Sequence, residues 1–381
     1  MKKIIKKLLR ESLNLINEVD WEGDFSDTKA SCVSPQQLAD DMNKELDRLN
    51  QSARKRDKRG TKDVILTRKH LEKHLTDDGK LDVLKFKELI TTPPKQIFDQ
   101  NDKMAKSDDG GKQMTVNTGL PAIKGIVYDE DAGKFYHINT CPGAGACQVV
   151  CYARHGQYGM NDGKVLKLIR RLNLLMNDPE EYYNMIMDEL EPLAFKLKRQ
   201  GRRSGSAPKL FIRWNDAGDF FSQKYFDIAK RVTKDLVNGG FNVTSYAYTK
   251  QAKFVNLAGD DFVMNFSKGS APRELKQVDL DNNKYSEMIP KELFKDIFQK
   301  KGPNYVKDEN GLSTFVDGGK EELRKRVSDT YDVDINRLKY HDELPPNEGK
   351  PLQYDVIVLP LGDKDINAQR RDVHKSFLAI H

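Results

Sequence analysis

The chain has 381 residues, of which 38% are hydrophobic and 32% are charged, and its net charge is +6. Four cysteines are too few for a secreted disulfide scaffold, and no apolar run approaches the ~20 residues that span a bilayer. We therefore expect a cytoplasmic protein of one large domain or two, without a transmembrane segment.

The first residues, "MKKIIKKLLRESLNLI" (1–16), form a basic amphipathic pattern. Lys6, Lys7 and Arg10 interrupt the apolar residues, so the segment lacks the continuous apolar core of a secretory signal. The pattern predicts a helix that caps the fold. The alternative is a helix that docks on a membrane surface, a nucleic acid or a protein partner.

Residues 1–98 are polar and predicted to be helical, with one helix beginning at Ser34-Pro35 and shorter helices in "TRKHLEKHL" and "DVLKFKELI". The run "SARKRDKRGTK" (52–62) has the charge to follow nucleic-acid phosphates, or it is an ordinary solvated surface. Residues 99–114 are rich in Gly, Asp and Lys without periodicity, and they predict a linker.

Residues 115–381 alternate between strand and helix patterns. Strands are predicted in "AIKGIVY", "KFYHINT", "LFIRW", "NVTSYAYT", "FVMNFS" and "YDVIVLP". Helices are predicted through 165–176, 183–197 and 225–236, the last with Ser222 as its N-cap and "NGG" as its end. Residues 271–350 are predicted to be an irregular insertion. This order predicts an α/β fold, either a partial (β/α) barrel or an open parallel sheet, with an N-terminal α-helical region.

Sites in parallel α/β folds lie at the carboxyl ends of the strands. The cysteine-rich loop follows "KFYHINT", the turn with Asp216, Gly218 and Asp219 follows "LFIRW", and Lys250 follows the next strand. "LGDKD" (361–365), with Asp363 and Asp365, follows "VIVLP". We expect these turns to converge on one rim of the sheet.

Three of the four cysteines, Cys141, Cys147 and Cys151, lie within "TCPGAGACQVVCYAR". Thiolates are ligands for zinc and iron–sulfur clusters, and Gly143 and Gly145 let the loop bend around a compact metal centre. A cubane held by three thiolates leaves one iron open, whereas zinc needs a fourth ligand such as His155 or His137. The remaining alternative is three small packing residues without metal, which is also the reading of Cys32.

The other rim residues have weaker assignments. Asp219 is a candidate for holding an ammonium or hydroxyl group of a cofactor, together with Asp216, Gly218 and Asp363. Lys250 and Tyr248 are candidates for contact with the substrate as catalytic residues. Each has a structural alternative, because Asp and Gly also favour strand-to-helix turns.

The blocks "TCPGAGACQVVCYAR", "RWNDAGDFFSQKY" and "YAYTK", in this order, resemble the bacteriophage family of gene product 88. The resemblance extends from about residue 115 to "RRDVHKSFLAIH" at the C-terminus and leaves out the first 100 residues. It implies a phage origin and an infected host cell as the location, with the virion as an alternative. An alternative role for the N-terminal helices, which lie outside the resemblance, is contact with another phage protein.

The cysteine loop also resembles, more distantly, the cluster loop of radical S-adenosylmethionine enzymes. These enzymes place three cysteines after the first barrel strand and a Gly-Gly-Glu-like motif after the next, where Ala217-Gly218-Asp219 stands here. The resemblance implies a [4Fe–4S] cluster on the three cysteines and S-adenosylmethionine on its open iron. The chain departs from the pattern in cysteine spacing, with five and three intervening residues instead of three and two, and in having Asp for Glu.

Three functions follow as hypotheses. The first is a phage iron–sulfur enzyme of the radical S-adenosylmethionine type that acts on nucleic acid or a nucleotide, recognised through basic segments 52–62 and 196–203. The second is a zinc-containing protein that binds or modifies nucleic acid without radical chemistry. The third is a structural or virion-associated protein in which the metal loop only stabilises the fold.

Overall fold

The computed structural model describes residues 25, 27–28, 30–53, 68–99, 113–148, 151, 153, 162–205, 207–259, 262–297, 316, 318–346, 352–359 and 365–379. The predicted N-terminal amphipathic helix (1–16) and all but the first two residues of the basic run 52–62 lie outside this part of the chain. So do most of the predicted linker 99–114 and the candidate residues His155 and Asp363.

The main element is an eight-stranded sheet in the order β2-β5-β6-β7-β8-β11-β10-β9, in which every neighbouring pair is parallel. The sheet is open and does not close into a barrel, which confirms the predicted α/β class with an open parallel sheet. Its strands are β2 (Gln113–Asn117), β5 (Lys209–Trp214), β6 (Val243–Thr249), β7 (Phe262–Ser267), β8 (Tyr285–Ile289), β9 (Leu338–Tyr340), β10 (Tyr354–Val358) and β11 (Val373–Ala379).

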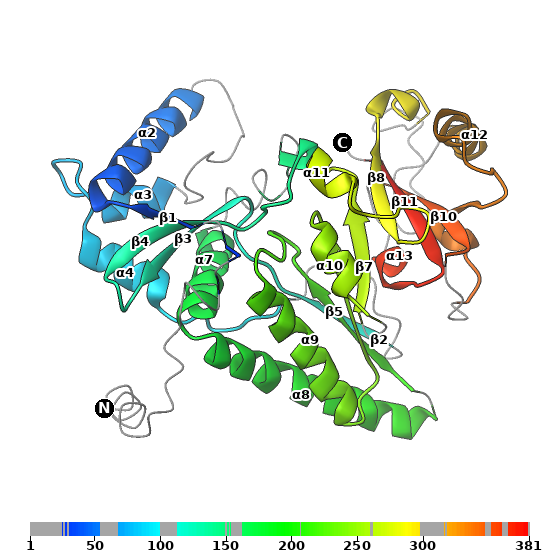
Figure 1. Ribbon diagram of the computed structural model, residues 1–381, viewed down its shortest axis with the longest axis horizontal. Helices are drawn as coiled ribbons and strands as arrows, with labels where there is room; N and C mark the ends of the chain where they lie inside the picture. The colour runs from blue at the N-terminus through cyan, green and yellow to red at the C-terminus, as the bar shows by residue number, and fades with distance from the viewer. Residues whose placement is uncertain are drawn as a thin grey trace.

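Helices cover one face of the β2–β7 half of this sheet (Figure 1). They are α7 (Asp162–Asn177), α8 (Pro179–Ser204), α9 (Gln223–Asn238) and α10 (Ala252–Leu257). The predicted N-cap of α9 is confirmed, since Ser222 Oγ accepts a hydrogen bond from the amide of Tyr225 at 3.2 Å, and Gly239 is the C-cap.

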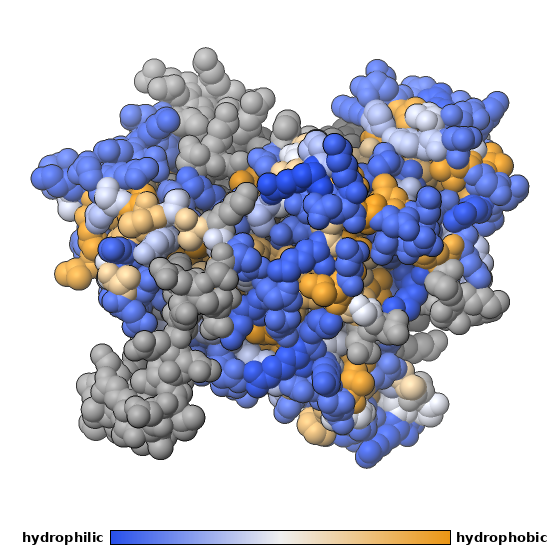
Figure 2. Space-filling model, viewed as in Figure 1, coloured by the Kyte–Doolittle hydropathy of each residue, from blue (hydrophilic) through white to orange (hydrophobic). Residues whose placement is uncertain are grey.

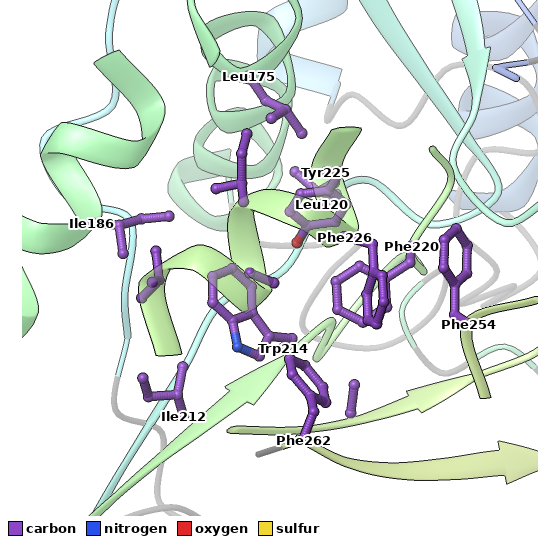
Figure 3. Close-up of a cluster of buried hydrophobic side chains, with 14 of the residues drawn as sticks. Leu120, Leu175, Ile186, Ile212, Trp214, Phe220, Tyr225, Phe226, Phe254 and Phe262 are labelled. Atoms are coloured by element: carbon purple, nitrogen blue, oxygen red, sulfur yellow. The ribbon is translucent and has the colours of Figure 1, made fainter. Parts of the chain in front are cut away.

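The core under these helices is strongly aromatic (Figure 3). Trp214 at the end of β5 is fully buried and meets Phe98, Phe220 and Tyr225 ring to ring at centroid distances of 6.0, 6.5 and 6.2 Å. The indole N–H donates to Ser245 Oγ at 3.1 Å, so its one polar group is satisfied. The aromatic residues Phe220 and Tyr225 therefore anchor the turn after β5 to the core beneath the helices.

The opposite face of the sheet is more polar. Because side chains alternate along a strand, Phe211 and Arg213 of β5 face away from the aromatic core, beside Tyr246 and Tyr248 of β6. The short helix α13 (Ile366–Gln369) packs on the lower part of this face through Ala368. The carboxyl-end half of the face holds the polar residues discussed below.

A second, three-stranded antiparallel sheet has the order β1-β4-β3, from β1 (Ala30–Val33), β3 (Lys124–Asp129) and β4 (Lys134–Asn139). The N-terminal region packs on it with α2 (Pro35–Ala53), α3 (Arg68–His74) and α4 (Val83–Thr91). One buried cluster joins Leu38 and Phe86 of this region to Phe135 and Ile169. The described part of the first hundred residues thus shares a core with the segment around β3, β4 and α7.

Two expectations differ from the structure. Residues 271–350, predicted to be an irregular insertion, contain strands β8 and β9 and helices α11 (Pro272–Leu275) and α12 (Gly319–Tyr331). These strands are short and carry charged residues such as Glu287, so their alternation is weak in the sequence. Within the residues 99–114, Asp99 bridges to Asn117 and β2 begins at Gln113. The division of the chain into domains at this point stays a prediction.

Candidate metal centre

The cysteine loop leaves β4, which belongs to the small antiparallel sheet and not, as predicted, to the parallel one. It nevertheless crosses to the rim of the main sheet. The amides of Gly145 and Cys147 donate to the carbonyl of Gly269 at 3.0 and 3.3 Å, and Ala144 forms a β-bridge with Ser270. Both partners follow β7. The loop therefore lies against the carboxyl end of a central parallel strand.

Two glycines make this close packing possible. A Cβ on Gly143 would collide with the carbonyl group of Lys250, after β6, and one on Gly145 would collide with the carbonyl group of Ser270, after β7. From the sequence, these glycines are expected to let the loop bend around a metal. In the structure their small size is used instead for contact with the neighbouring rim loops.

Asp219 joins three loops at the rim. It is fully buried; its amide donates to the carbonyl of Thr140 at 2.9 Å, next to Cys141. Its Oδ1 accepts from the amide of Phe220 and its Oδ2 from the amide of Lys250, each at 2.8 Å. Burial raises the pKa of Asp219, and the charge of Lys250 opposes this rise. Both carboxylate oxygens are thus engaged by the chain itself, which makes Asp219 a positioning residue.

The charge of Lys250 interacts with Asp219 and with the three cysteines. Burial disfavours its charge, but Asp219 and then Cys141, Cys147 and Cys151 favour it, and the net effect is a raised pKa. The ammonium group is therefore a fixed positive charge beside the sulfur atoms. Lys250 is therefore a candidate cation for a negatively charged centre on the cysteine loop.

The thiols themselves differ in environment. Burial raises the pKa of Cys141 to about 12, and its Sγ accepts a hydrogen bond from the amide of Ile123 at 3.3 Å. Burial also raises the pKa of Cys147. Cys151 is half-buried beside Ala122, Leu168 and Ala217. Without a metal, buried thiols of this kind are protonated and poor nucleophiles.

In the described part of the chain, no three His, Cys, Asp or Glu side chains are close enough to hold a metal ion as they stand. His137, one alternative zinc ligand, is buried on β4 within the small sheet. Cys32 is exposed on β1 and remote in sequence from the loop. The three cysteines share one loop and one neighbouring cation, and they are not preassembled as ligands.

A second polar cluster lies at the carboxyl end of β5, on the face of the sheet opposite the aromatic core. We call this face the inner face. Arg213 forms ion pairs of 3.2 Å with both Asp216 and Asp365, and all three side chains are nearly buried. Tyr246 donates to Asp365 at 2.7 Å. The Arg213 guanidinium also lies 5.7 Å from the ring centre of Tyr248. Asp216 and Tyr248, predicted as site residues, therefore lie together, held by an arginine.

Gly218 has a φ of +79° and lies against Leu120 and Pro121, so it serves the turn. Arg213 was missed by sequence reasoning, although an arginine inside the apolar run "LFIRW" signals a buried charge that needs partners. Asp365 was noted only as a weak candidate. No local pattern predicts that it reaches β5, since 150 residues lie between Trp214 and Asp365 in the sequence.

Comparison with known proteins gives one family match, in which a model described as "Gene product 88" matches residues 95–326, more than half of the chain. No curated protein and no solved structure matches. Among the described residues, none of the helices combines the length and apolar character needed to cross a membrane.

Proposed function

The chain belongs to the gene product 88 family, the phage family that its cysteine loop resembles, and from this premise we propose that it is an iron–sulfur enzyme of the radical S-adenosylmethionine type. The cluster would be held by Cys141, Cys147 and Cys151. The location in the infected host cell, and the contact of the N-terminal helices with another phage protein, remain part of this proposal.

The observation that carries the proposal is the convergence at the rim. Backbone hydrogen bonds hold the cysteine loop against the residues after β7, and Asp219 ties it to the residues after β5 and β6. Neutral thiols gain little from the charge of Lys250. Thiolates around a metal are anionic, and a neighbouring cation stabilises them.

The donor set fits an iron–sulfur cluster in chemistry, since three thiols on one loop are soft ligands and leave one iron for another ligand. The sulfur atoms must approach one another on binding, because they are not preassembled. When bound with S-adenosylmethionine, such a cluster supplies reductive cleavage of the cofactor and hydrogen abstraction from a substrate.

The residues of this chain would then have distinct tasks. Lys250 balances the negative charge of the thiolates, and Asp219 fixes the turns on either side of it. Tyr248 and the pair Asp216–Arg213 line the inner face next to the rim, where a substrate or the cofactor is to be oriented. Nucleic acid or a nucleotide stays the proposed substrate class, on the strength of the basic segment 196–203 and the run 52–62.

The test is anaerobic purification followed by metal and sulfide analysis and an absorption spectrum, for the wild type, Cys147→Ala and Cys32→Ala. Cys32 is a matched control, because it is an exposed cysteine on β1, outside the loop. We expect iron and sulfide in near-equal amounts, lost in Cys147→Ala and kept in Cys32→Ala. Cleavage of added S-adenosylmethionine under reducing conditions is the next measurement.

Zinc as the only metal in protein that never met oxygen would overturn the radical mechanism and favour a zinc-containing nucleic-acid protein, the alternative that the sequence allows. Equal metal content in the wild type and Cys147→Ala would remove the cysteine loop from metal binding altogether.

A further inference from the structure

A cavity of about 390 Å³ lies at the opposite, amino-terminal edge of the sheet from the cysteine loop. It is enclosed by the last turns of α8, the connection into β5 and the turn between α9 and β6. Small residues, among them Ala194, Gly201 and Ala207, leave the space open, and Leu197, Leu210 and Phe241 give it apolar walls. The volume lies in the range of small-molecule sites.

The rim of this cavity is basic. Lys198 and Arg202 line it, and Lys196, Arg199 and Arg203 extend the charge along the same end of α8. Lys198 donates to the carbonyl of Gly240 at 2.9 Å. Among the residues that the structure describes, none of these five cations forms an ion pair with a carboxylate. The helix dipole favours cations in the last turn, which accounts for Arg202 and Arg203 but not for the other three.

An exposed aromatic residue stands beside the cations. Phe195 is 59% exposed and meets Phe241 edge to face, with ring centres 4.7 Å apart. Phe195, Lys198, Arg199 and Arg202 have the i, i+3, i+4, i+7 spacing that places them on one side of α8. In Figure 2 the surface is largely hydrophilic, with small hydrophobic areas among the charged residues, including near the end of α8.

We propose that this surface, formed by Phe195, Lys198, Arg199, Arg202, Phe241 and the cavity, binds single-stranded nucleic acid, with an unpaired base against the aromatic residues and flanking phosphates on the cations. Proteins bind single strands through aromatic side chains that stack on the bases and through cations that contact the phosphates. An acidic peptide satisfies the cations equally well, but it gives no role to the exposed Phe195 or to an apolar cavity.

The inference deepens the proposed function by naming the contact for a nucleic-acid substrate, yet it rests on residues that are independent of the cysteines. Because the site is at the opposite edge of the sheet, it holds the strand and does not present the reacting group. Loss of one proposal leaves the other intact.

The test is fluorescence anisotropy of a labelled oligonucleotide of about 12 nucleotides, a length within the usual site sizes, with the anaerobically purified full chain. Variants are Phe195→Ala and Arg202→Glu, both at exposed positions, with Lys325→Glu on α12 as the matched charge control. We expect Phe195→Ala to weaken binding roughly 5- to 100-fold. Arg202→Glu should also weaken it and lower the slope of log K against log salt by about 0.7 or more. Lys325→Glu should bind within about twofold of the wild type.

Absence of oligonucleotide binding by the wild type overturns the inference. Unchanged binding by Phe195→Ala also overturns it. Competition by polyglutamate and by the matching duplex that is as strong as competition by the single strand overturns it as well. Iron content is measured on the same samples. If variants that do not bind the strand keep the iron content of the wild type, only the strand site is affected. If protein without iron binds the strand, the iron–sulfur proposal fails and the strand site stands.

Discussion

The amide of Lys250 donates a hydrogen bond of 2.8 Å to Oδ2 of Asp219, and through this bond the turn after β5 holds the turn after β6. Oδ1 of the same aspartate accepts a hydrogen bond from the amide of Phe220. The amide of Asp219 donates to the carbonyl of Thr140, beside the first cysteine of the loop. One buried residue thus fixes the relative position of three loops.

Asp219→Asn tests this arrangement. The amide side chain keeps one acceptor oxygen and turns the other into a donor that faces a backbone N–H, so one buried hydrogen bond is lost. We expect a decrease of about 1–3 kcal/mol in the free energy of unfolding, measured with urea. Asp329→Asn, at an exposed position on α12, should change it by less than about 0.5 kcal/mol. Equal stability of the two variants would contradict the role of Asp219.

Gly143→Ala tests the packing of the cysteine loop on the rim. The new Cβ meets the backbone carbonyl group of Lys250, whose amide is held by Asp219, so the backbone must shift at a residue that is already fixed. We expect a loss of about 1–3 kcal/mol in stability and a lower iron content per chain. Gly133→Ala is the control, since Gly133 has a φ of +66° on the β3–β4 turn and no close neighbour. It should cost about 1 kcal/mol and leave the iron unchanged.

Arg213→Met tests the inner-face cluster. It leaves Asp216 and Asp365 buried near each other without a cation, and we expect a cost of about 3–5 kcal/mol in unfolding free energy. The double variant Arg213→Met/Asp365→Asn should recover part of this cost in a double-mutant cycle. Arg231→Met, which breaks an exposed pair with Glu180, should cost less than about 1 kcal/mol. Additive costs for Arg213 and Asp365 would mean that the pair does not interact.

Lys284 predicts a particular pH dependence. Burial lowers its pKa to about 7 from the ordinary 10.5, although its ammonium group donates to the carbonyls of Asn367 and Val373. Between about pH 7 and 10.5 the unfolded chain binds more protons at this residue than the folded one, so stability rises with pH in that window. Below about pH 7 both states are protonated and the penalty is constant.

Lys284→Met removes this titration. From pH 7 to 9 the wild type should gain about 2 kcal/mol of stability relative to Lys284→Met, as measured by urea unfolding at both pH values. A difference between the two proteins that does not change with pH would mean that Lys284 stays charged in the folded state.

Strong local patterns in the sequence were sufficient for much of the fold. The apolar runs of β5, β6, β7 and β10 and the periodicity of α7, α8 and α9 match the structure. Ser222 and "NGG" marked the ends of α9 correctly. Strands β8 and β11 were not predicted from their patterns, because Glu287 and Lys375 interrupt them. The structure pairs these two charges with each other at 2.7 Å, a contact between residues far apart in the sequence.

The sequence predicted which residues lie at the site, but it did not predict the contacts between them. Residues at the ends of parallel strands converge by geometry alone, which is why Asp219 and Lys250 were expected near the cysteines. The assignment of β4 to the parallel sheet was wrong, because a strand beside a short turn pairs with its neighbour, and β3 and β4 form such a hairpin. The engagement of Asp219 by backbone amides depends on loop conformations that a residue pattern does not encode.

The position of β11 in the sheet has a consequence for folding during synthesis on the ribosome. It is the last of the eight strands in the chain, yet it lies between β8 and β10, and in this sheet β10 and β9 join the earlier strands only through it. Until residues 373–379 emerge, the growing chain has two unpaired strand edges facing one another across a gap. Premature termination before this segment would therefore release two half-sheets with exposed edges, a form prone to aggregation.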